Sequence, residues 1–275
     1  MSDWEVEAVY WRSKDFPEWA RRRNCKPIRH NMLSKSRKWS ADACIYVAGN
    51  ADPIASVKYP LRDLQQNVIA LHRFLQGYRG GFVFMSSAAV YEGHRGTVSV
   101  ATCLHPRLPY AISKMASERY IAHFAENRSL DWATILRLYY GYGPYDRDSR
   151  LVPRIVQAGR SRDRTFVVTA PRGTLVDPLY AEDIAHAALS AARGLAKGET
   201  LDLCGGRPMY VADFAREAAA AGGWRLRIVS RPRREEVPLS FHSSPLPTRK
   251  RLGLSPFTPV TAGLPKYLRW LEEPA

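Results

Sequence analysis

Phe82–Tyr91 reads FVFMSSAAVY, an apolar run that leads directly into two serines. The run predicts a buried strand over Phe82–Met85. A hydroxyl at the carboxyl end of such a strand lies where α/β sheets bind their ligands. We therefore predict that Ser87 belongs to a ligand site, although serines also occur in ordinary turns.

Short apolar runs and helical patterns alternate on both sides of this strand. Further strands are predicted at Val6–Tyr10, Ala43–Val47, Thr134–Leu138 and Thr165–Thr169. Helices are predicted at Leu61–Leu75, Tyr110–Glu126, Val152–Ala158, Ala181–Ala192, Val211–Ala221 and Ala262–Leu271. This alternation is typical of an α/β protein whose mostly parallel sheet is covered by helices.

The composition limits the partners and the compartment. Lys and Arg outnumber Asp and Glu by 41 to 26, a formal charge of +15, which should attract anions. Because the sequence has no basic stripe interleaved with aromatic residues, we interpret the charge as a solvated arginine-rich surface and expect no nucleic acid. The four cysteines are far apart, so we expect neither a metal site nor disulfides. Cysteines without disulfides fit a reducing compartment, and we expect a cytoplasmic protein. No apolar run reaches the about 18 residues of a membrane span.

Tyr110 and Lys114 stand four residues apart at the start of a predicted helix, so they share one face. Transfer of hydride between a ketone and an alcohol needs a proton donor or acceptor beside the oxygen. A nearby ammonium favours the phenolate and lowers the pKa of a tyrosine. We predict that Lys114 does this for Tyr110, while Ser87 holds the substrate oxygen. A surface Tyr and Lys on an ordinary helix would show the same spacing.

Several segments resemble, in order, the extended short-chain dehydrogenase/reductase family, which includes nucleotide-sugar epimerases and dehydratases. Ser86–Tyr91 resembles its SSxxVYG motif, and Leu108–Lys114 its SPYAxSK motif. Val47–Pro53 is similar to the family's LAA…P segment, and Asn67-Val68 to its NVxGT helix. Leu136–Pro144, Asp177–Asp183 and Leu252–Pro256 are similar to its LRxxNVYGP, RDFVYVDD and LGWxP motifs.

The resemblance implies a Rossmann-type doubly wound parallel sheet with a small C-terminal substrate-binding lobe. Because loops become longer after Gly143-Pro144, we expect a dinucleotide-binding domain over 1–150. Residues 151–275 would then form mainly the substrate lobe, with interleaved sheet elements. The family's catalytic residues would be Ser87, Tyr110 and Lys114, acting beside a nicotinamide cofactor.

The family begins with a strand, a glycine-rich turn and a helix, whereas the first glycine here is Gly49. Such a turn presents a helix N-terminus to the cofactor's pyrophosphate. We expect that the native chain carries roughly 20 to 25 more residues upstream, the length of a strand, turn and helix. A shortened relative without activity is the alternative, which the intact Ser87, Tyr110 and Lys114 disfavour.

The resemblance also assigns cofactor contacts. The end of the second family strand selects the cofactor, and Arg12 and Ser13 there favour the 2′-phosphate of NADP over NAD. Asn31 and Met32 stand where the family contacts adenine. The remaining predicted cofactor contacts are Ala48, Gly49, Asn67, Tyr110 and Lys114.

The substrate positions depart from the family pattern. Ala88 and Ala89 replace the Asp-Glu pair of dehydratases, so dehydration by that route is not expected. Tyr140 replaces an asparagine, and Val176 replaces the arginine that grips a nucleotide pyrophosphate. The predicted substrate contacts are Ser87, Ala88, Tyr140, Arg154 and Arg172, the last two as anion contacts.

These residues lead to three hypotheses. The first is an NAD(P)-dependent epimerase or ketoreductase acting on a nucleotide sugar. The second is a reductase of a non-sugar ketone. The arginine-rich second half of the chain argues against it, because such a sequence does not predict an apolar pocket. The third is a non-catalytic scaffold or basic binding protein. By analogy with the family, the helices Leu61–Leu75 and Tyr110–Glu126 are expected to form a homodimer.

Overall fold

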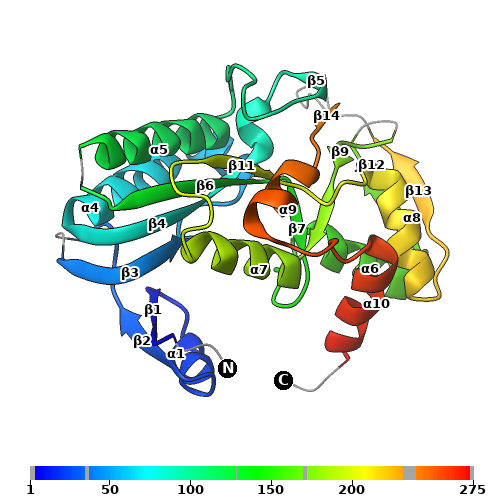
Figure 1. The fold of residues 1–275 in the computed structure, drawn as a ribbon. Helices are drawn as coiled ribbons and strands as arrows, with labels where there is room; N and C mark the ends of the chain where they lie inside the picture. The colour runs from blue at the N-terminus through cyan, green and yellow to red at the C-terminus, as the bar shows by residue number, and fades with distance from the viewer. Residues whose placement is uncertain (1–3, 35–36, 128, 170–171, 232–239, 273–275) are drawn as a thin grey trace.

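The computed structural model describes residues 4–34, 37–127, 129–169, 172–231 and 240–272. At its centre lies a four-stranded parallel sheet in the order β11-β6-β4-β3 (Figure 1). The strands are β3 (Trp39–Tyr46), β4 (Tyr78–Ser87), β6 (Trp132–Leu138) and β11 (Thr200–Leu203). Phe82, Val83 and Phe84 are almost fully buried, as expected for a strand covered on both faces. The predicted α/β class is confirmed.

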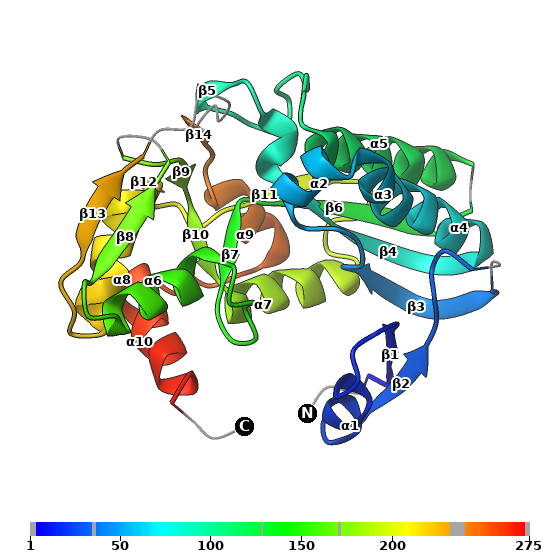
Figure 2. The same cartoon turned by 180° about the vertical axis from the view of Figure 1, so that it is seen from behind.

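One face of this sheet is covered by the helices that follow β3 and β4 (Figure 2). They are α2 (Pro53–Lys58), α3 (Pro60–Leu64), a π-helical turn (Gln65–Ile69), α4 (Ala70–Gly77) and α5 (Pro109–Glu126). Leu71, Leu75 and Ile121 pack against Phe82 and Phe84 of β4. The helix predicted over 61–75 is therefore one run of helical turns with a π-helical segment in its middle.

The opposite face is covered by α7 (Ala181–Ala192), with α9 (Leu246–Leu252) beside it (Figure 1). Small alanines of α7, including Ala187 and Ala191, pack against Val83 and Leu136. Their size lets the helix lie close to the sheet. Since α7 and β11 come from the second half of the chain, that half completes the central sheet.

A second apolar core lies away from the sheet. Its elements are α6 (Leu151–Arg160), β8 (Thr165–Val168), α8 (Val211–Ala221), β13 (Arg227–Ser230) and α10 (Val260–Trp270). Two short strand pairs connect it to the sheet: β7 (Tyr140–Tyr142) with β10 (Pro178–Tyr180), and β9 (Leu175–Val176) with β12 (Met209–Tyr210). This core gives the chain a lobe distinct from the sheet.

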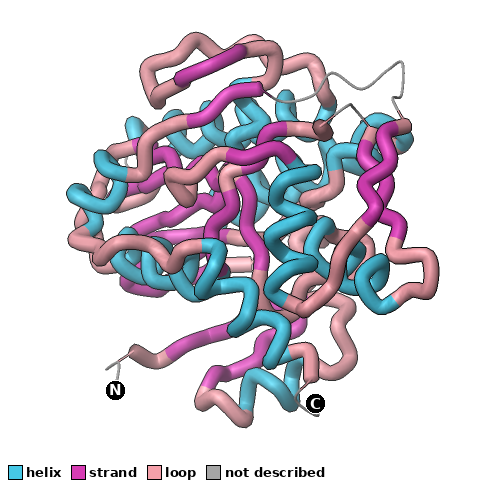
Figure 3. Tube along the Cα trace, turned by 90° about the vertical axis from the view of Figure 1, so that its right-hand side faces the viewer, coloured by secondary structure: helices cyan, strands magenta, loops and turns pink. Residues whose placement is uncertain are grey.

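Two further strand pairs lie outside the central sheet. At the N-terminal side, β1 (Val6–Tyr10) pairs in parallel with β2 (Cys25–Arg29), with α1 (Phe16–Arg21) between them in sequence. At the other end of the molecule, β5 (Arg95–Thr97) pairs with β14 (Ser240–His242) (Figure 1, Figure 3). None of the helices in the described ranges is long and apolar enough to cross a membrane.

Candidate active site

A cavity of about 320 Å³ lies at the carboxyl ends of β4 and β6, between the sheet and the second lobe. The lining includes apolar, aromatic and ionisable side chains from both halves of the chain. They are Val47, Ala51, Pro53, Met85, Ser86, Ser87, Ala88, Ala89, Tyr110, Lys114, Leu138, Tyr139, Tyr140, Gly141, Arg150, Thr174, Leu175, Val176, Asp177 and Phe241. The structure thus brings Ser87, Tyr110 and Lys114, and also Ala88 and Tyr140, to one cavity.

Ser87 is the last residue of β4, and it both ends the strand and faces the cavity. Its Oγ accepts a hydrogen bond from the backbone N–H of Ala89 at 3.2 Å, which caps the 3₁₀ turn Ala88–Tyr91. Ser87 also lies close enough to Tyr110 to lower the pKa of its phenol. The sequence allowed two interpretations of Ser87, a turn residue and a ligand contact. In the structure Ser87 caps a turn and also lines the cavity, so the two are compatible.

Tyr110 is positioned by the first turn of α5. Pro109 stands at the start of the helix, where its missing N–H costs nothing, and the N–H of Tyr110 donates to Ser56 Oγ at 3.1 Å. Burial raises the pKa of Tyr110, while Ser87 and the charge of Arg150 oppose that rise. The phenol therefore keeps its proton at neutral pH and can donate it to an oxygen in the cavity.

Lys114 follows one helical turn later and is almost fully buried. Its Nζ donates to the carbonyl oxygen of Met85 at 3.1 Å and lies 4.8 Å from the Phe84 ring centroid and 5.9 Å from that of Tyr110. Burial lowers the pKa of Lys114 to about 8, while the charges of Asp63 and Glu118 oppose the fall. Ser87 and the charge of Arg150 act against the rise in the pKa of Tyr110, and the predicted effect of Lys114 on that phenol stays a prediction.

A buried polar network lies behind these residues. Glu118 on α5 forms a two-point ion pair with Arg137 on β6, at 3.0 and 2.7 Å, and accepts a hydrogen bond from Ser86 at 2.6 Å. Arg137 Nη1 donates to the Tyr91 hydroxyl at 2.7 Å, which donates to Asp202 at 2.8 Å. The network joins α5, β6 and β11, so it holds the helix of Tyr110 and Lys114 against the sheet.

Another polar cluster supports α5 from the side of α3. Asp63, which is 1% exposed, accepts hydrogen bonds on Oδ1 from Asn50 at 2.7 Å and from Asn67 at 3.0 Å. Gly49 has a φ of +136°, and a Cβ there would meet Asn67 Oδ1 at 2.3 Å. Of the predicted cofactor contacts, Gly49 and Asn67 therefore lie against each other.

The other predicted cofactor contacts lie elsewhere. Arg12 and Ser13 are exposed in the loop that follows β1. Asn31 Oδ1 accepts a hydrogen bond from the N–H of Leu33 at 2.9 Å, and Met32 packs against the core under the sheet. Ala48 is exposed beside Gly49. None of these five residues lines the cavity, and their role toward a cofactor stays a prediction.

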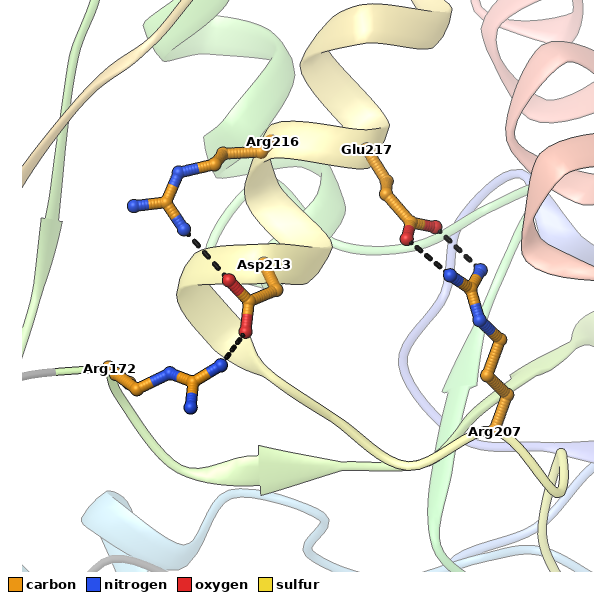
Figure 4. A network of polar contacts seen from close by, with 5 residues as sticks. All are labelled: Arg172, Arg207, Asp213, Arg216 and Glu217. Carbon is orange, nitrogen blue, oxygen red and sulfur yellow. Dashed lines mark hydrogen bonds and ion pairs between the residues drawn. The ribbon is translucent and has the colours of Figure 1, made fainter.

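The arginines predicted as substrate contacts lie outside the cavity. Arg154 is exposed on α6, with its guanidinium 5.6 Å from the centroid of the Phe166 ring. Arg172 pairs with Asp213 at 2.6 Å and lies over Tyr210, with its guanidinium carbon 4.2 Å from the ring centroid. Figure 4 shows Arg172 and Arg216 sharing Asp213, next to the two-point pair of Arg207 and Glu217. Arg172 is thus held at the surface of the lobe by an ion pair with a carboxylate that Arg216 shares.

The structure adds two ionisable groups that the sequence did not single out as contacts. Arg150, just before α6, lines the cavity and lies over Tyr140, with its guanidinium carbon 5.4 Å from the ring centroid. It has an ion pair of 3.5 Å with Asp146. Asp177 also lines the cavity, and burial raises its pKa to about 6. The sequence did not indicate a role for Arg150, because a loop arginine is ordinarily solvated. Asp177 stands in the motif Asp177–Asp183, but the motif did not predict that it lines the cavity.

Comparisons with known proteins agree on the family. The model of the NAD dependent epimerase/dehydratase family matches residues 5–204. The GDP-6-deoxy-D-mannose reductase of Pseudomonas aeruginosa is 25% identical over 210 residues, which are 70% of this chain and 67% of that protein. A protein of Bacillus subtilis named as an uncharacterized UDP-glucose epimerase, YtcB, is 28% identical over 124 residues, only 39% of either chain.

Solved structures agree on the fold. RMD from Pseudomonas aeruginosa complexed with NADPH superposes with a TM-score of 0.81 at 21% identity, covering 98% of this chain and all of that one (100%). UDP-glucose 4-epimerase from Thermotoga maritima, with UDP-glucose, gives a TM-score of 0.83 at 20% identity, covering 98% of this chain and 91% of that one. At these identities the likeness establishes the fold, and the predicted Rossmann-type class is confirmed.

Proposed function

Because the chain belongs to the NAD dependent epimerase/dehydratase family, we propose that it is an NAD(P)-dependent epimerase or ketoreductase acting on a nucleotide sugar. The observation that carries the proposal is the common cavity of Ser87, Tyr110 and Lys114. Ser87 orients the substrate oxygen, and Tyr110 exchanges a proton with it. Since burial keeps the proton on Tyr110, the site favours protonation of a carbonyl oxygen, the direction of reduction.

The residues beside Lys114 fit a nicotinamide cofactor. Val47, Ala51 and Pro53 contribute apolar side chains to the cavity that Lys114 also lines. The ammonium of Lys114 has N–H groups beyond the one given to Met85. When bound, the cofactor would accept or deliver hydride at the substrate carbon. Lys114 would bind the cofactor's ribose, and Arg12 and Ser13 would favour NADP over NAD.

Arg150 is the proposed contact for the anionic part of the substrate. It is half-buried and lines the same cavity as Tyr110, and its positive charge acts on that phenol. Its guanidinium has two Nη groups that the 3.5 Å pair of Nε with Asp146 leaves available. A planar fork of this kind suits a phosphate or a carboxylate. Arg154 and Arg172 then serve other purposes, as their ring and ion-pair contacts indicate.

A non-sugar ketone is the second candidate, and the lining favours it. The second half of the chain contributes the apolar Leu175, Val176 and Phe241 to the cavity beside the polar Thr174 and Asp177, so part of that wall is apolar. A relative in Homo sapiens named sterol-4-alpha-carboxylate 3-dehydrogenase, decarboxylating, is 27% identical over 129 residues, 46% of this chain and 33% of that protein. An apolar wall of this kind accepts a hydrocarbon skeleton as well as the face of a sugar ring.

The second apolar core suggests that the two halves of the chain bind different ligands. We propose that residues 1–150 bind the cofactor and that residues 151–275 bind mainly the substrate. Two elements of the second part, α7 and β11, belong to the central sheet and its covering layer. We also propose a homodimer. Leu61 and Leu64 on α3, with Ile112 and Tyr120 on α5, are exposed, and a second copy of this chain would cover them.

The proposal is tested with a panel of UDP-glucose, UDP-glucuronic acid, GDP-6-deoxy-D-mannose and simple sterol ketones, each with NAD(H) and NADP(H). We expect turnover of a nucleotide sugar. An epimerase changes the sugar without net use of cofactor. A reductase acts on these alcohols in the reverse direction, oxidising a hydroxyl to a ketone while NAD(P)+ is reduced. Arg150→Leu should raise the KM for that sugar, while the matched surface variant Arg154→Leu should not. Turnover of the sterol ketones alone, or no binding of any nicotinamide cofactor, would contradict the proposal.

A further inference from the structure

Among the described residues, Asp63 on α3 receives hydrogen bonds only from uncharged groups. It is 1% exposed, and its two hydrogen-bond donors, Asn50 and Asn67, are neutral amides that both bind Oδ1. Oδ2 has no hydrogen-bond partner among the described residues. A carboxylate removed from water in this way is costly unless a positive charge lies within reach.

The charge of Asp63 acts on Lys114, on the neighbouring helix α5, where it raises the pKa of the ammonium against the effect of burial. The helices of the two residues are joined at this point, because Ser117 Oγ, one turn beyond Lys114, donates to the carbonyl oxygen of Asn67 at 3.1 Å. Asn67 in turn donates its amide to Asp63. Lys114 has given one N–H to Met85 and retains donors, while Asp63 Oδ2 is an acceptor without a donor.

The other groups that face Lys114 do not compensate its charge fully. Glu118, on its own helix, is already paired at two points with Arg137 on β6. From β4, Lys114 meets the Met85 carbonyl oxygen and the Phe84 ring, which are uncharged. Tyr110, on its own helix, keeps its proton because burial raises its pKa. Of the two carboxylates that act on Lys114, Asp63 is therefore the one without an ion pair in the described part of the chain.

We propose that Asp63 is a positioning residue that acts on catalysis through Lys114: its carboxylate is the counter-charge that keeps the buried lysine protonated. The same charge also acts on Tyr110, where it favours the protonated phenol. Both effects keep the site in one protonation state, an ammonium beside a neutral phenol. Removal of the charge should therefore release the proton of Lys114 at a lower pH.

The first test needs neither cofactor nor substrate, so its failure is separate from failure of the proposed function. Asp63→Asn has the same shape, and its side-chain oxygen can still accept from Asn50 and Asn67. Lys114 is charged at pH 6 and loses its proton through about pH 8. The loss of unfolding free energy in Asp63→Asn should therefore be greatest near pH 6 and shrink as the pH rises through 8.

Two variants separate charge from structure. Asn50→Ala removes a hydrogen bond to Asp63 but leaves its charge, so its loss of stability should not change over the same pH range. In a Lys114→Met background, the pH-dependent part of the Asp63→Asn effect should disappear. A loss that is constant with pH, a loss that persists with Met at 114, or an Asp63→Asn protein unfolded at every pH would overturn the proposal.

The catalytic consequence rests on the proposed function and has its own measurement. In the active enzyme, the alkaline limb of the pH–rate profile should move to lower pH by about one pH unit in Asp63→Asn, because a nearby opposite charge shifts a pKa by about that much or more. Asp63→Glu, which restores the charge, should recover the limb. An unchanged limb in Asp63→Asn would contradict a role through Lys114.

Discussion

Replacement of Arg137 by leucine is expected to destabilise the protein strongly. The side chains of Arg137 and Glu118 are each 7% exposed, and their two-point pair has distances of 3.0 and 2.7 Å. Arg137→Leu would leave the Glu118 carboxylate buried with Ser86 as its hydrogen-bond partner, and would also remove the donor to Tyr91. Breaking a buried pair from one side costs about 3–5 kcal/mol, so we expect a loss of that size.

The assay is equilibrium unfolding in urea, followed by tryptophan fluorescence. The matched control is Arg172→Leu, because Arg172 also pairs with a carboxylate at 2.6 Å but its side chain is 61% exposed. An exposed pair contributes about 0–1 kcal/mol, so this variant should unfold almost as the parent does. The double variant Arg137→Leu/Glu118→Leu should be less destabilised than Arg137→Leu alone. An Arg137→Leu protein as stable as Arg172→Leu would refute the reasoning.

Three further predictions follow from the site and its surroundings. Ser87→Ala should lower kcat by about 10²-fold while cofactor binding, measured by fluorescence titration, is unchanged; equal loss of both would contradict its role on the substrate oxygen. Gly49→Ala should destabilise the fold by about 1–3 kcal/mol in urea unfolding, because a Cβ would meet Asn67 Oδ1 at 2.3 Å and the φ of +136° suits glycine; a neutral change would show that the loop adapts. Leu61→Glu should convert the dimer to a monomer in light scattering, and a parent protein that is already monomeric would contradict the dimer.

The sequence predicted helices and strands well where their apolar residues recur with a single helical or strand period. The apolar spacing of Ala181–Ala192 and Val211–Ala221 gave both helices with the bounds that the structure has. Cys25–Arg29 was not predicted as a strand, because Pro27 and two basic residues mask any alternation. Thr200–Leu203 was missed because four residues next to a turn carry too little pattern, although its pairing with β6 completes the sheet.

The candidate site was predictable only where a motif marked it. Ser87, Tyr110 and Lys114 stand in recognisable segments, and the structure places all three at one cavity. Arg150 reaches the same cavity from a loop 40 residues after Tyr110, a contact that only the tertiary fold creates. Asp63 is polar and sits on a helix, a pattern that ordinarily indicates a solvated position, yet packing of α3 against α5 buries it. Their roles depend on neighbours distant in sequence.

The measurement that tests the central claim most directly is the single-turnover rate of hydride exchange in Tyr110→Phe, with the nucleotide sugar that the panel identifies. Loss of the phenolic proton donor should slow this step by about 10²–10⁴-fold, while cofactor binding stays as in the parent protein. A Tyr110→Phe protein that exchanges hydride at nearly the parent rate would show that the proton passes through another group and would contradict the account.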